Sequence, residues 1–496
     1  MELFLDGLKA VLSINILVAL LVGAIGGVII GAIPGVGAAI AIAIVLPATF
    51  HMEPLVGLTL LLGIYAASAY GGAIPAVLIN TPGTPVNALT TYDGYPMTRR
   101  GEGRRALSLA YSSSFFGGIF SVVCLILITP FLAAIAPMFG SRDIFMAALL
   151  GIVLVIIAHR GRSLAAGMFV FFGMFLNTVG MENIRYTQRY TFGLKWLYGG
   201  FDLIPVVIGL FALSQAFVLL INENEQPEVP KLEGGLFQGL AEVVLRFKKI
   251  ATPSAGFGVI MGIIPGVGEF LAQFFSYSLA QRISKTPERF GRGAPEGIVA
   301  SETANNAVPA AAMIPLLSLG IPGEALTAMM LSVFYVHNII PGPALFSTTP
   351  EFPVSLYLCL FVGNLIILLF LVLTTNKILY LIRVPSRFLG VLILALSLVG
   401  VYSVRNSLAD CTVAAAFGTF GYVLKRLDLP IVPIILGMVL GRILDDKFRS
   451  GLARIETPLD LINRPVAAAI FGIIIIALIA HFWGLYTQRR SRTGSH

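Results

Sequence analysis

Charged side chains are scarce along this chain, and their scarcity restricts the fold more than any other feature of the sequence. Asp, Glu, Lys and Arg account for 12% of the 496 residues, whereas hydrophobic residues account for 57%. Soluble domains carry roughly 25% charged residues. So few charges cannot cover so much apolar surface in water, and the sequence therefore predicts an all-α polytopic protein of the lipid bilayer. With about 20 residues per crossing, the chain accommodates about 12 transmembrane segments.

Apolar runs separated by short polar loops occur along the whole chain. They lie near 14–31, 36–50, 55–79, 105–135, 144–158, 163–179, 201–221, 255–281, 296–318, 324–346, 354–382, 387–402, 408–424, 430–443 and 466–486. Some are too short or too interrupted by Gly and Pro to be independent spans, which predicts broken helices or re-entrant hairpins. The net charge of +8 arises in the loops, so it indicates membrane orientation and gives no support to a nucleic-acid partner.

The most polar interior stretch, NENEQPEVPKLEGG at 222–235, divides the chain. We predict a first transmembrane repeat at 1–221, this polar linker, a second, inverted transmembrane repeat at 236–460, and a C-terminal span and tail at 461–496. Directly after the linker, 236–250 combines apolar and basic residues at helical spacing. This pattern is typical of an amphipathic helix at a membrane interface, and a solvated connector is the alternative.

Two Pro-Gly patterns recur in the two parts of the chain. The segment 31–37, GAIPGVG, matches 262–268, GIIPGVG, and the two lie 231 residues apart. A second match, 240 residues apart, pairs Pro75 and Pro82-Gly83 with Pro315 and Pro322-Gly323. Glycines also recur every four residues in both parts, as Gly27, Gly31 and Gly35 and as Gly258, Gly262 and Gly266. Such rows predict close approach of another helix backbone, and the matches together indicate an internal repeat.

Loop charges indicate how the repeats are oriented. Four arginines fall within 96–106, whereas its counterpart 336–346 has no Lys or Arg. Conversely, 282–292 carries four basic residues and its counterpart 51–61 has none. Because cationic loops stay in the cytoplasm, matching loops lie on opposite membrane faces and the repeats are inverted. Many secondary transporters have this symmetry and bind substrate near the membrane midplane between the repeats.

Each Pro-Gly pair predicts a break in a helix. Proline removes a backbone N–H, and glycine adopts conformations that other residues avoid. One such break would indicate a packing kink. Four breaks, at 34–37, 82–85, 265–268 and 322–323, favour binding sites, because half-helix ends offer N–H groups to anions and carbonyl groups to cations.

Polar side chains accompany these breaks. They are Asn80, Thr81, Thr84 and Asn87 in the first part, and Ser301, Glu302, Thr303, Asn305, Asn306 and Ser318 in the second. Their amides and hydroxyls can bind carboxylate oxygens, and their oxygens can coordinate Na⁺, although an isolated Ser or Thr usually bonds to its own helix. Glu269, Glu302 and Glu324 are candidates for coupling to a proton or cation, with an interfacial position or a salt bridge as the alternative.

Enzyme motifs do not accompany these features. The sequence has no Gly-Lys dipeptide and hence no Walker A loop, and it has no H-E-x-x-H motif or Cys pair for a metal. We therefore expect a protein that is not an enzyme and that uses no cofactor besides a coupling ion. The segment Asp93-Gly94-Tyr95-Pro96 predicts a turn before the basic loop, with a helix cap or a subunit contact as alternatives.

In combination, the motifs are specific. They are GAIPGVG at 31–37, YGGAIPAVLINTPG at 70–83, DGYP at 93–96, GIIPGVG at 262–268, ETANN at 302–306, GIPG at 320–323 and PGPALF at 341–346. With them the chain resembles the large membrane subunit of the tripartite tricarboxylate transporters, the TctA-like permeases of bacteria. The resemblance implies an inner-membrane permease that works with a small four-span membrane subunit and a periplasmic solute-binding protein. It also implies import of an organic carboxylate, driven by a Na⁺ or proton gradient.

The resemblance and the breaks together give a candidate site. The expected substrate-binding residues are Gly35, Val36, Gly37, Asn80, Thr81, Gly83, Thr84, Gly266, Val267, Gly268, Asn305, Asn306 and Gly323. The expected ion-coupling residues are Pro34, Pro265, Glu302, Asn305, Asn306 and Pro322. Glu269 departs from the family pattern, in which a small or hydroxyl residue is expected.

The expected mechanism includes a motion, and the expected function has an alternative. By analogy, a transport domain moves as an elevator against a scaffold that includes 354–382. A channel, or a carboxylate transporter that needs no binding protein, is the alternative function. The oligomeric state and the identity of the carboxylate are also open.

Overall fold

The computed structural model describes residues 2–159, 161–182, 187–221, 238–266, 268–378, 384–452 and 457–493. Helices dominate these residues, which also contain one two-stranded sheet. Within this part of the chain, eight helices are long and apolar enough to cross a membrane, and three shorter helices are also apolar. The predicted all-α polytopic membrane class is therefore confirmed.

The helices and strands follow one another along the chain in a fixed order. They are α1 (Glu2–Val11), α2 (Ile14–Ala32), α3 (Gly37–Thr49), α4 (Pro54–Ile79), η1 (Pro85–Asn87), α5 (Ala88–Arg99), α6 (Gly103–Ile135), η2 (Ala136–Met138), α7 (Ser141–Ala158), α8 (Ser163–Thr178), β1 (Gly180–Met181), β2 (Gln188–Arg189), η3 (Lys195–Leu197), α9 (Leu203–Val207), η4 (Ile208–Leu213), α10 (Ser214–Ile221), α11 (Gln238–Ala241), η5 (Glu242–Arg246), α12 (Lys248–Ile263), α13 (Gly268–Ile283), η6 (Pro287–Arg289), α14 (Pro295–Leu319), α15 (Ala325–Val336), α16 (Pro343–Thr348), α17 (Glu351–Ile378), α18 (Ser386–Arg405), α19 (Leu408–Arg426), α20 (Val432–Leu452), η8 (Pro458–Ile462) and α21 (Pro465–Thr493). The elements η4 and η5 are π-helical turns, and the other η elements are 3₁₀ turns.

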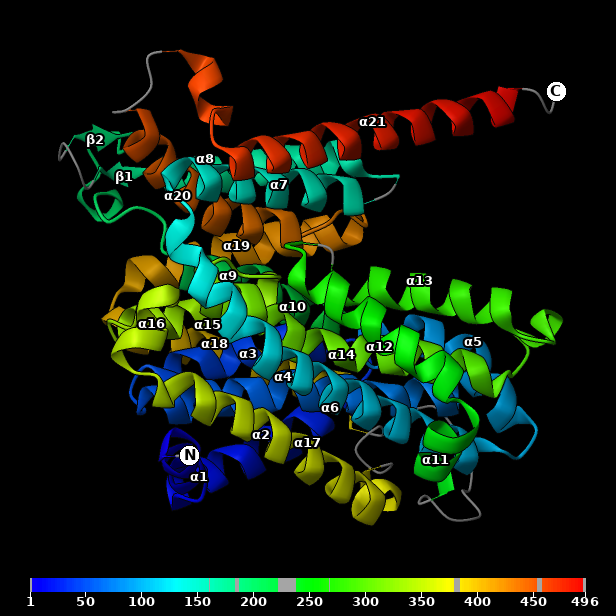
Figure 1. The fold of residues 1–496 in the computed structure, drawn as a ribbon. Helices are drawn as coiled ribbons and strands as arrows, with labels where there is room; N and C mark the ends of the chain where they lie inside the picture. Colours follow the sequence, from blue (N-terminus) through cyan, green and yellow to red (C-terminus); the bar gives the residue numbers. More distant parts are fainter. Residues whose placement is uncertain are drawn as a thin grey trace. The chain divides into compact units, whose positions relative to one another are not determined.

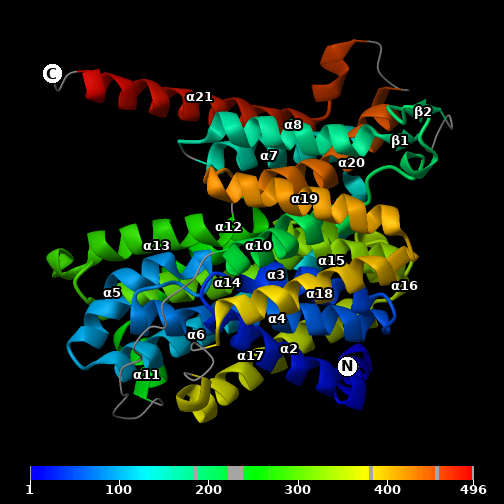
Figure 2. The ribbon, with the colours of Figure 1, turned by 180° about the vertical axis from the view of Figure 1, so that it is seen from behind.

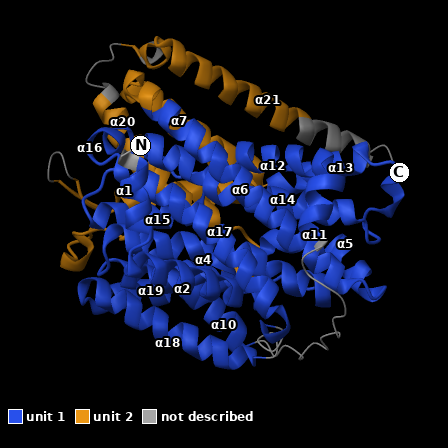
Figure 3. Ribbon diagram, turned by 60° about the horizontal axis from the view of Figure 1, so that its bottom comes forward, with its two compact units in different colours: residues 1–133, 203–263, 267–423 blue, residues 134–202, 264–266, 424–496 orange. Residues whose placement is uncertain are grey.

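Contacts divide the chain into two compact units, which Figure 3 colours separately. The first unit comprises 1–133, 203–263 and 267–423, and the second comprises 134–202, 264–266 and 424–496. These units are defined by contacts, whereas the predicted repeats are defined by sequence similarity. The boundaries of the repeats stay a prediction. The predicted linker, 222–235, lies outside the described residues.

The second unit is a helical layer with the small sheet attached. Helix α20 packs on α7 and α8, and α21 packs on α7. Two strands, β1 and β2, pair antiparallel, with Gly180 opposite Arg189. Arg189 forms an ion pair with Glu182 at 2.8 Å, and Arg464 forms one with the buried Asp143 at 3.0 Å.

Helices α4 and α14 form the buried centre of the first unit, with α2 packed on α4 and α12 packed on α14. The glycine rows explain how close these pairs come. A Cβ added at Gly31 would lie 2.1 Å from the Ser68 carbonyl oxygen, and one at Gly258 would lie 2.4 Å from that of Ala304. Only glycine permits such an approach, so the predicted faces are confirmed for Gly27, Gly31, Gly258 and Gly262, whereas Gly35 and Gly266 lie in the breaks after the helices.

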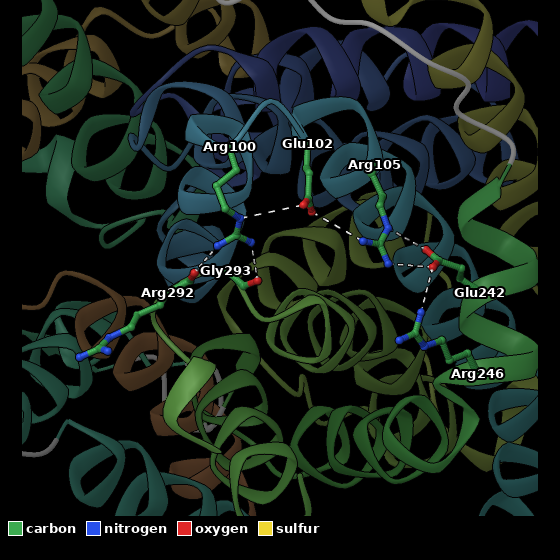
Figure 4. A network of polar contacts seen from close by, with 7 residues as sticks. All are labelled: Arg100, Glu102, Arg105, Glu242, Arg246, Arg292 and Gly293. Carbon is green, nitrogen blue, oxygen red and sulfur yellow. Dashed lines mark hydrogen bonds and ion pairs between the residues drawn. The ribbon is translucent and has the colours of Figure 1, made fainter. Parts of the chain in front are cut away.

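The loops of the first unit separate by charge. Helix α5 lies at one end of this unit and α16 at the opposite end in both ribbon views (Figures 1 and 2). The basic loop after α5 meets the basic loop before α14, because the Arg100 guanidinium donates to the carbonyl oxygens of Arg292 (2.6 Å) and Gly293 (2.9 Å) (Figure 4). An inverted pair of repeats requires this grouping of basic loops, and the inversion itself stays a prediction.

The segment 236–250, expected to be amphipathic, is helical from Gln238 to Arg246 and again from Lys248, where α12 begins. Glu242 pairs with Arg105 of α6 at 2.8 Å and with Arg246 at 3.7 Å, as Figure 4 shows. Val243 is buried, whereas Leu245 is 76% exposed. One face of the segment is thus attached to α6, and the other presents apolar and basic side chains together.

The segment 93–96 lies inside α5, so the predicted turn is wrong. Gly94 serves close packing instead, because a Cβ there would lie 2.8 Å from a Val77 methyl carbon. Asp93 is fully buried, and its Oδ1 accepts three backbone N–H groups at 2.8 to 2.9 Å, those of Gly291, Gly293 and Ala294. Since Ala294 is the N-cap residue of α14, the helix-cap alternative is the one that the contacts support.

Candidate transport site

The backbone is broken where the Pro-Gly pairs predicted it. Gly35, Gly37, Gly266 and Gly268 all have positive φ, between 56° and 81°. Left-handed residues also end the two central helices, Asn80 after α4 and Gly320 after α14. Glycine adopts these conformations without steric cost, so the repeated glycines are explained by the chain path.

In the first repeat, the two breaks join each other. The Gly35 N–H donates to the Gly83 carbonyl at 3.0 Å, and the Gly83 N–H donates to the Gly72 carbonyl at 3.2 Å. A Cβ at Gly83 would lie 2.0 Å from the Gly31 carbonyl oxygen. Helix α3 begins beside this junction, with Thr84 next to Gly37. The structure thus brings together Gly35, Val36, Gly37, Gly83 and Thr84.

The second repeat has a corresponding arrangement in part. A Cβ at Gly323 would lie 2.6 Å from the Gly262 carbonyl oxygen, and one at Gly268 would lie 3.7 Å from the Glu324 carboxylate. Pro265 and Gly266 are in contact with α7 in the second compact unit, through Gly151 and Val155. The neighbouring Val267 lies outside the described residues.

Glu302 is the most extensively hydrogen-bonded of the expected site residues, and it is fully buried. Its Oε1 accepts from Asn87 of η1 at 3.0 Å and from the hydroxyl of Thr90 of α5. Its Oε2 accepts from Ser114 of α6 at 3.1 Å and from Asn306 at 3.4 Å. These partners are uncharged and come from both halves of the chain, so one carboxylate connects four elements.

Asn305 and Asn306 differ sharply although they are neighbours. The Asn306 amide nitrogen donates to Ser114 at 2.7 Å, in addition to its contact with Glu302, whereas its oxygen has no donor among the described residues. Asn305 is fully buried, and neither its amide nitrogen nor its oxygen has a partner among the described residues. A buried amide without partners is costly, so Asn305 stays a candidate ligand-binding residue.

Other expected residues lie away from this centre. Asn80 and Thr81 are exposed, whereas Pro322 is buried and Pro34 is half-buried. The Thr81 hydroxyl bonds only locally, to the Ile79 carbonyl at 3.3 Å. None of these positions has a contact with Glu302 among the interactions of the described residues, so their assignment to a site stays a prediction.

Three residues around this centre were not among the expected site residues: Thr90, Ser114 and Gln273. Gln273 of α13 is fully buried, and its Nε2 donates to the Val86 carbonyl of η1. A run of three serines, 112–114, inside the apolar α6 was a signal for Ser114. Thr90 and Gln273 give no such signal, because each contacts a segment that is distant in sequence, by 212 and 187 residues respectively.

Comparisons with known proteins identify the family. The family model "Tripartite tricarboxylate transporter TctA family" matches residues 17–436. An Agrobacterium vitis protein described as "Uncharacterized 52.8 kDa protein in TAR-I ttuC' 3'region" is 32% identical over 455 residues, covering 90% of either chain. A second A. vitis protein, "Uncharacterized protein in TAR-II ttuC' 3'region", is 33% identical over 224 residues, which is 45% of this chain and 92% of its own.

A solved structure of a mutant manganese transporter from Eremococcus coleocola has a TM-score of 0.10 to this chain at 12% identity, and it covers 85% of this chain and 95% of its own. A TM-score this low does not indicate a shared fold. The family model spans most of the chain, and the first A. vitis relative aligns over nearly its full length. This chain therefore belongs to the tripartite tricarboxylate transporter TctA family.

Proposed function

We propose that this chain is the large permease subunit of a secondary active importer that moves a small di- or tricarboxylate into the cytoplasm. Membership of the TctA family supports a tricarboxylate permease and implies partner subunits. The proposed partners are a small four-span membrane subunit and a periplasmic solute-binding protein that delivers the substrate. A Na⁺ or proton gradient across the bacterial inner membrane drives uptake.

The observation that carries this proposal is the buried Glu302 centre beside broken helices. A carboxylate held by uncharged donors within membrane-spanning helices is typical of an ion or substrate pathway. Helix α3 begins next to the joined breaks of the first repeat, and its first N–H groups have no partner within the helix. We propose that the substrate carboxylate binds at this helix end, where such groups favour an anion.

Transport requires the site to open to each membrane face in turn. In the proposed mechanism, Glu302, Asn305 and Asn306 respond to the coupling ion, and the helix breaks give the flexible points of the motion. An elevator movement of a transport domain is the form that we propose for it. Disulfide crosslinks between that domain and its scaffold are then expected to stop uptake, and unaffected uptake would exclude this motion.

Substitution of the two asparagines tests the proposed site. Asn305→Ala and Asn306→Ala are compared in cells that express the complete transporter, with radiolabelled di- and tricarboxylates. We expect at least a roughly tenfold rise in the half-saturating substrate or ion concentration for each variant, since buried polar contacts are lost. The exposed Asn463→Ala is the matched control. Uptake with unchanged affinity in both site variants would contradict the assignment.

A further inference from the structure

The second repeat carries buried polar residues in α13 and α14 where the first repeat has apolar ones. At the 231-residue spacing, Glu269 and Gln273 of α13 stand where the first repeat has Ala38 and Ile42. At the 240-residue spacing, α14 carries further polar groups where α4 is mostly apolar: Glu302, Asn305 and Asn306 stand opposite Leu62, Tyr65 and Ala66. The repeated scaffold does not require these polar residues, because the first repeat forms its helices without most of them. These polar residues are therefore specific to the second repeat, which indicates a role beyond forming the helices.

Helices α13 and α14 pack directly against each other. The Ser276 hydroxyl donates to the Ala300 carbonyl at 2.8 Å, and Ala272 belongs to the same buried cluster as Ala304. Glu269 and Gln273 flank this contact line on α13 at a spacing of one helical turn. Asn305 follows Ala304 directly on α14.

The short turn η1 brings the polar groups of both helices to one region. Gln273 donates to the Val86 carbonyl, and the adjacent Asn87 donates to Glu302 at 3.0 Å. Val86 thus binds a side chain of α13, and the next residue, Asn87, binds a side chain of α14. Gln273 and Glu302 therefore meet at η1. Glu269 lies one helical turn before Gln273 on α13, and both side chains are buried.

Oxygen atoms in this region lack hydrogen-bond donors. Glu269 is 8% exposed, and Gln273 and Asn305 are fully buried. Among the described residues, no donor meets the Oε1 of Glu269, the Oε1 of Gln273 or either polar atom of the Asn305 amide. The bond to Val86 fixes the Gln273 amide, so its free oxygen has a defined orientation. Burial of several unpaired oxygens is unfavourable unless a ligand supplies positive charge.

We infer that Glu269, Gln273 and Asn305 bind one Na⁺ ion per chain. Carboxylate and amide oxygens are ligands for hard cations. Glu302 already accepts hydrogen bonds on both oxygens, so it orients the surrounding groups and adds negative potential. Among the three proposed ligands only Glu269 is charged, so its carboxylate balances the single positive charge of Na⁺. The described residues contain no group of three or more His, Cys, Asp or Glu side chains that suits a metal ion of higher charge.

Proton binding alone does not account for this arrangement. The amide oxygens of Gln273 and Asn305 do not take up protons at ordinary pH, so a proton carrier would leave them unpaired. A Na⁺ ion contacts all three side chains at once. This inference rests on the proposed function and deepens it, since it names the coupling ion and limits this site to the second repeat.

Thermal unfolding of the purified full-length protein in detergent tests the inference. NaCl is titrated against choline chloride at constant ionic strength, without substrate or partner subunits. We expect Na⁺ to raise the unfolding temperature of the wild type by several degrees with a saturable dependence, because a ligand that binds the native state stabilises it. In Glu269→Gln and Gln273→Leu, the half-effective Na⁺ concentration is expected to rise about tenfold or more.

Matched controls separate ion binding from folding. Glu288→Gln and Gln281→Leu change the same residue types at exposed positions near the same helix, and they are expected to keep the wild-type Na⁺ response. The unfolding temperature of each variant in choline chloride shows whether it folds, and Gln273→Glu, which retains an oxygen ligand, serves if Gln273→Leu unfolds. A wild type that responds equally to Na⁺ and choline would overturn the inference, as would an unchanged Na⁺ response in Glu269→Gln.

The proposed function can fail separately. If Na⁺ binds as expected but the complete transporter moves no carboxylate, the cation site stands and the proposed function falls. If carboxylate uptake is driven by a proton gradient and purified protein ignores Na⁺, the proposed function stands and the cation site falls.

Discussion

At the scale of single residues, the hydrogen bonds to one buried carboxylate, that of Glu302, hold the proposed site together. Glu302 is fully buried, and the side chains that donate to it come from η1, α5, α6 and α14. Buried charges require such hydrogen bonds, because desolvation is otherwise costly. The same bonds fix the positions of Asn87 and Asn306. Glu302 therefore determines the geometry of the surrounding site.

Glu302→Gln is expected to lower both stability and uptake. A carboxylate has two acceptor oxygens, whereas a carboxamide has one. In Glu302→Gln, the NH₂ group would therefore face hydroxyl and amide donors that now donate to a carboxylate oxygen. The unpaired donors cost about 1–3 kcal/mol, which scanning fluorimetry detects as a lower unfolding temperature. The exposed Glu351→Gln is the control. Wild-type stability and uptake in Glu302→Gln would contradict the role of this residue.

The sequence predicted part of this centre. Glu302, Asn305 and Asn306 are conspicuous because polar residues are rare in an apolar run, and the repeat pointed to the same region. Thr90 and Gln273 were missed, because each acts through contact with a distant segment. Glu269 was noticed as a departure from the family pattern. Its candidate role as an ion ligand depends on its burial one helical turn from Gln273.

At the scale of helices and loops, close packing of glycine faces positions the breaks. The row in α2 lies on α4, and the row in α12 lies on α14. The glycine of each second break then rests on a carbonyl of the same row, Gly83 on Gly31 and Gly323 on Gly262. Four-residue glycine spacing was enough to predict this packing, because the pattern depends only on helix geometry.

Gly31→Ala is expected to destabilise the protein, because its Cβ would lie 2.1 Å from the Ser68 carbonyl oxygen. Relief of that overlap moves α2 away from α4, and overpacking typically costs about 1–3 kcal/mol. Gly26→Ala in the same helix is the control, since nothing lies within 4 Å of its added Cβ. Thermal unfolding of the two variants measures the difference, and equal stability would argue against the close α2–α4 contact.

Asp93→Asn is expected to loosen the loop before α14. The carboxylate accepts three backbone N–H groups of that loop on one oxygen, and a neutral amide accepts them more weakly. Hydrogen–deuterium exchange of peptides from 287–300 is then expected to be faster than in the wild type, while exchange in the distant α17 is unchanged. Identical protection of the loop in both proteins would refute this role.

The structure of 93–96 shows why local sequence misleads at this point. Asp, Gly, Tyr and Pro together favour a turn when the surroundings are ignored. In the fold, Gly94 is required by its contact with Val77, and Asp93 is required by a loop about two hundred residues later in the sequence. Neither requirement is local, so four residues taken alone could not reveal it.

At the scale of the whole molecule, loop charge predicts the orientation in the membrane. We expect cysteines introduced at Arg289 and Ser347, both exposed, to react on opposite sides when Cys124, Cys359 and Cys411 are replaced by Ala. A membrane-impermeant maleimide is expected to label the Ser347 position in intact cells and the Arg289 position only after permeabilisation, because basic loops stay in the cytoplasm. Labelling of both positions from one side would rule out inverted repeats.

Coupled uptake by the reconstituted transporter shows whether this chain belongs to a cation-driven carboxylate importer. The purified complex is placed in proteoliposomes, and accumulation of radiolabelled di- and tricarboxylates is followed with an inward Na⁺ gradient, an inward proton gradient or neither. We expect saturable accumulation of at least one carboxylate above its external concentration, only with a cation gradient and only with an intact Asn305 and Asn306. Equal accumulation with and without both gradients would contradict this expectation.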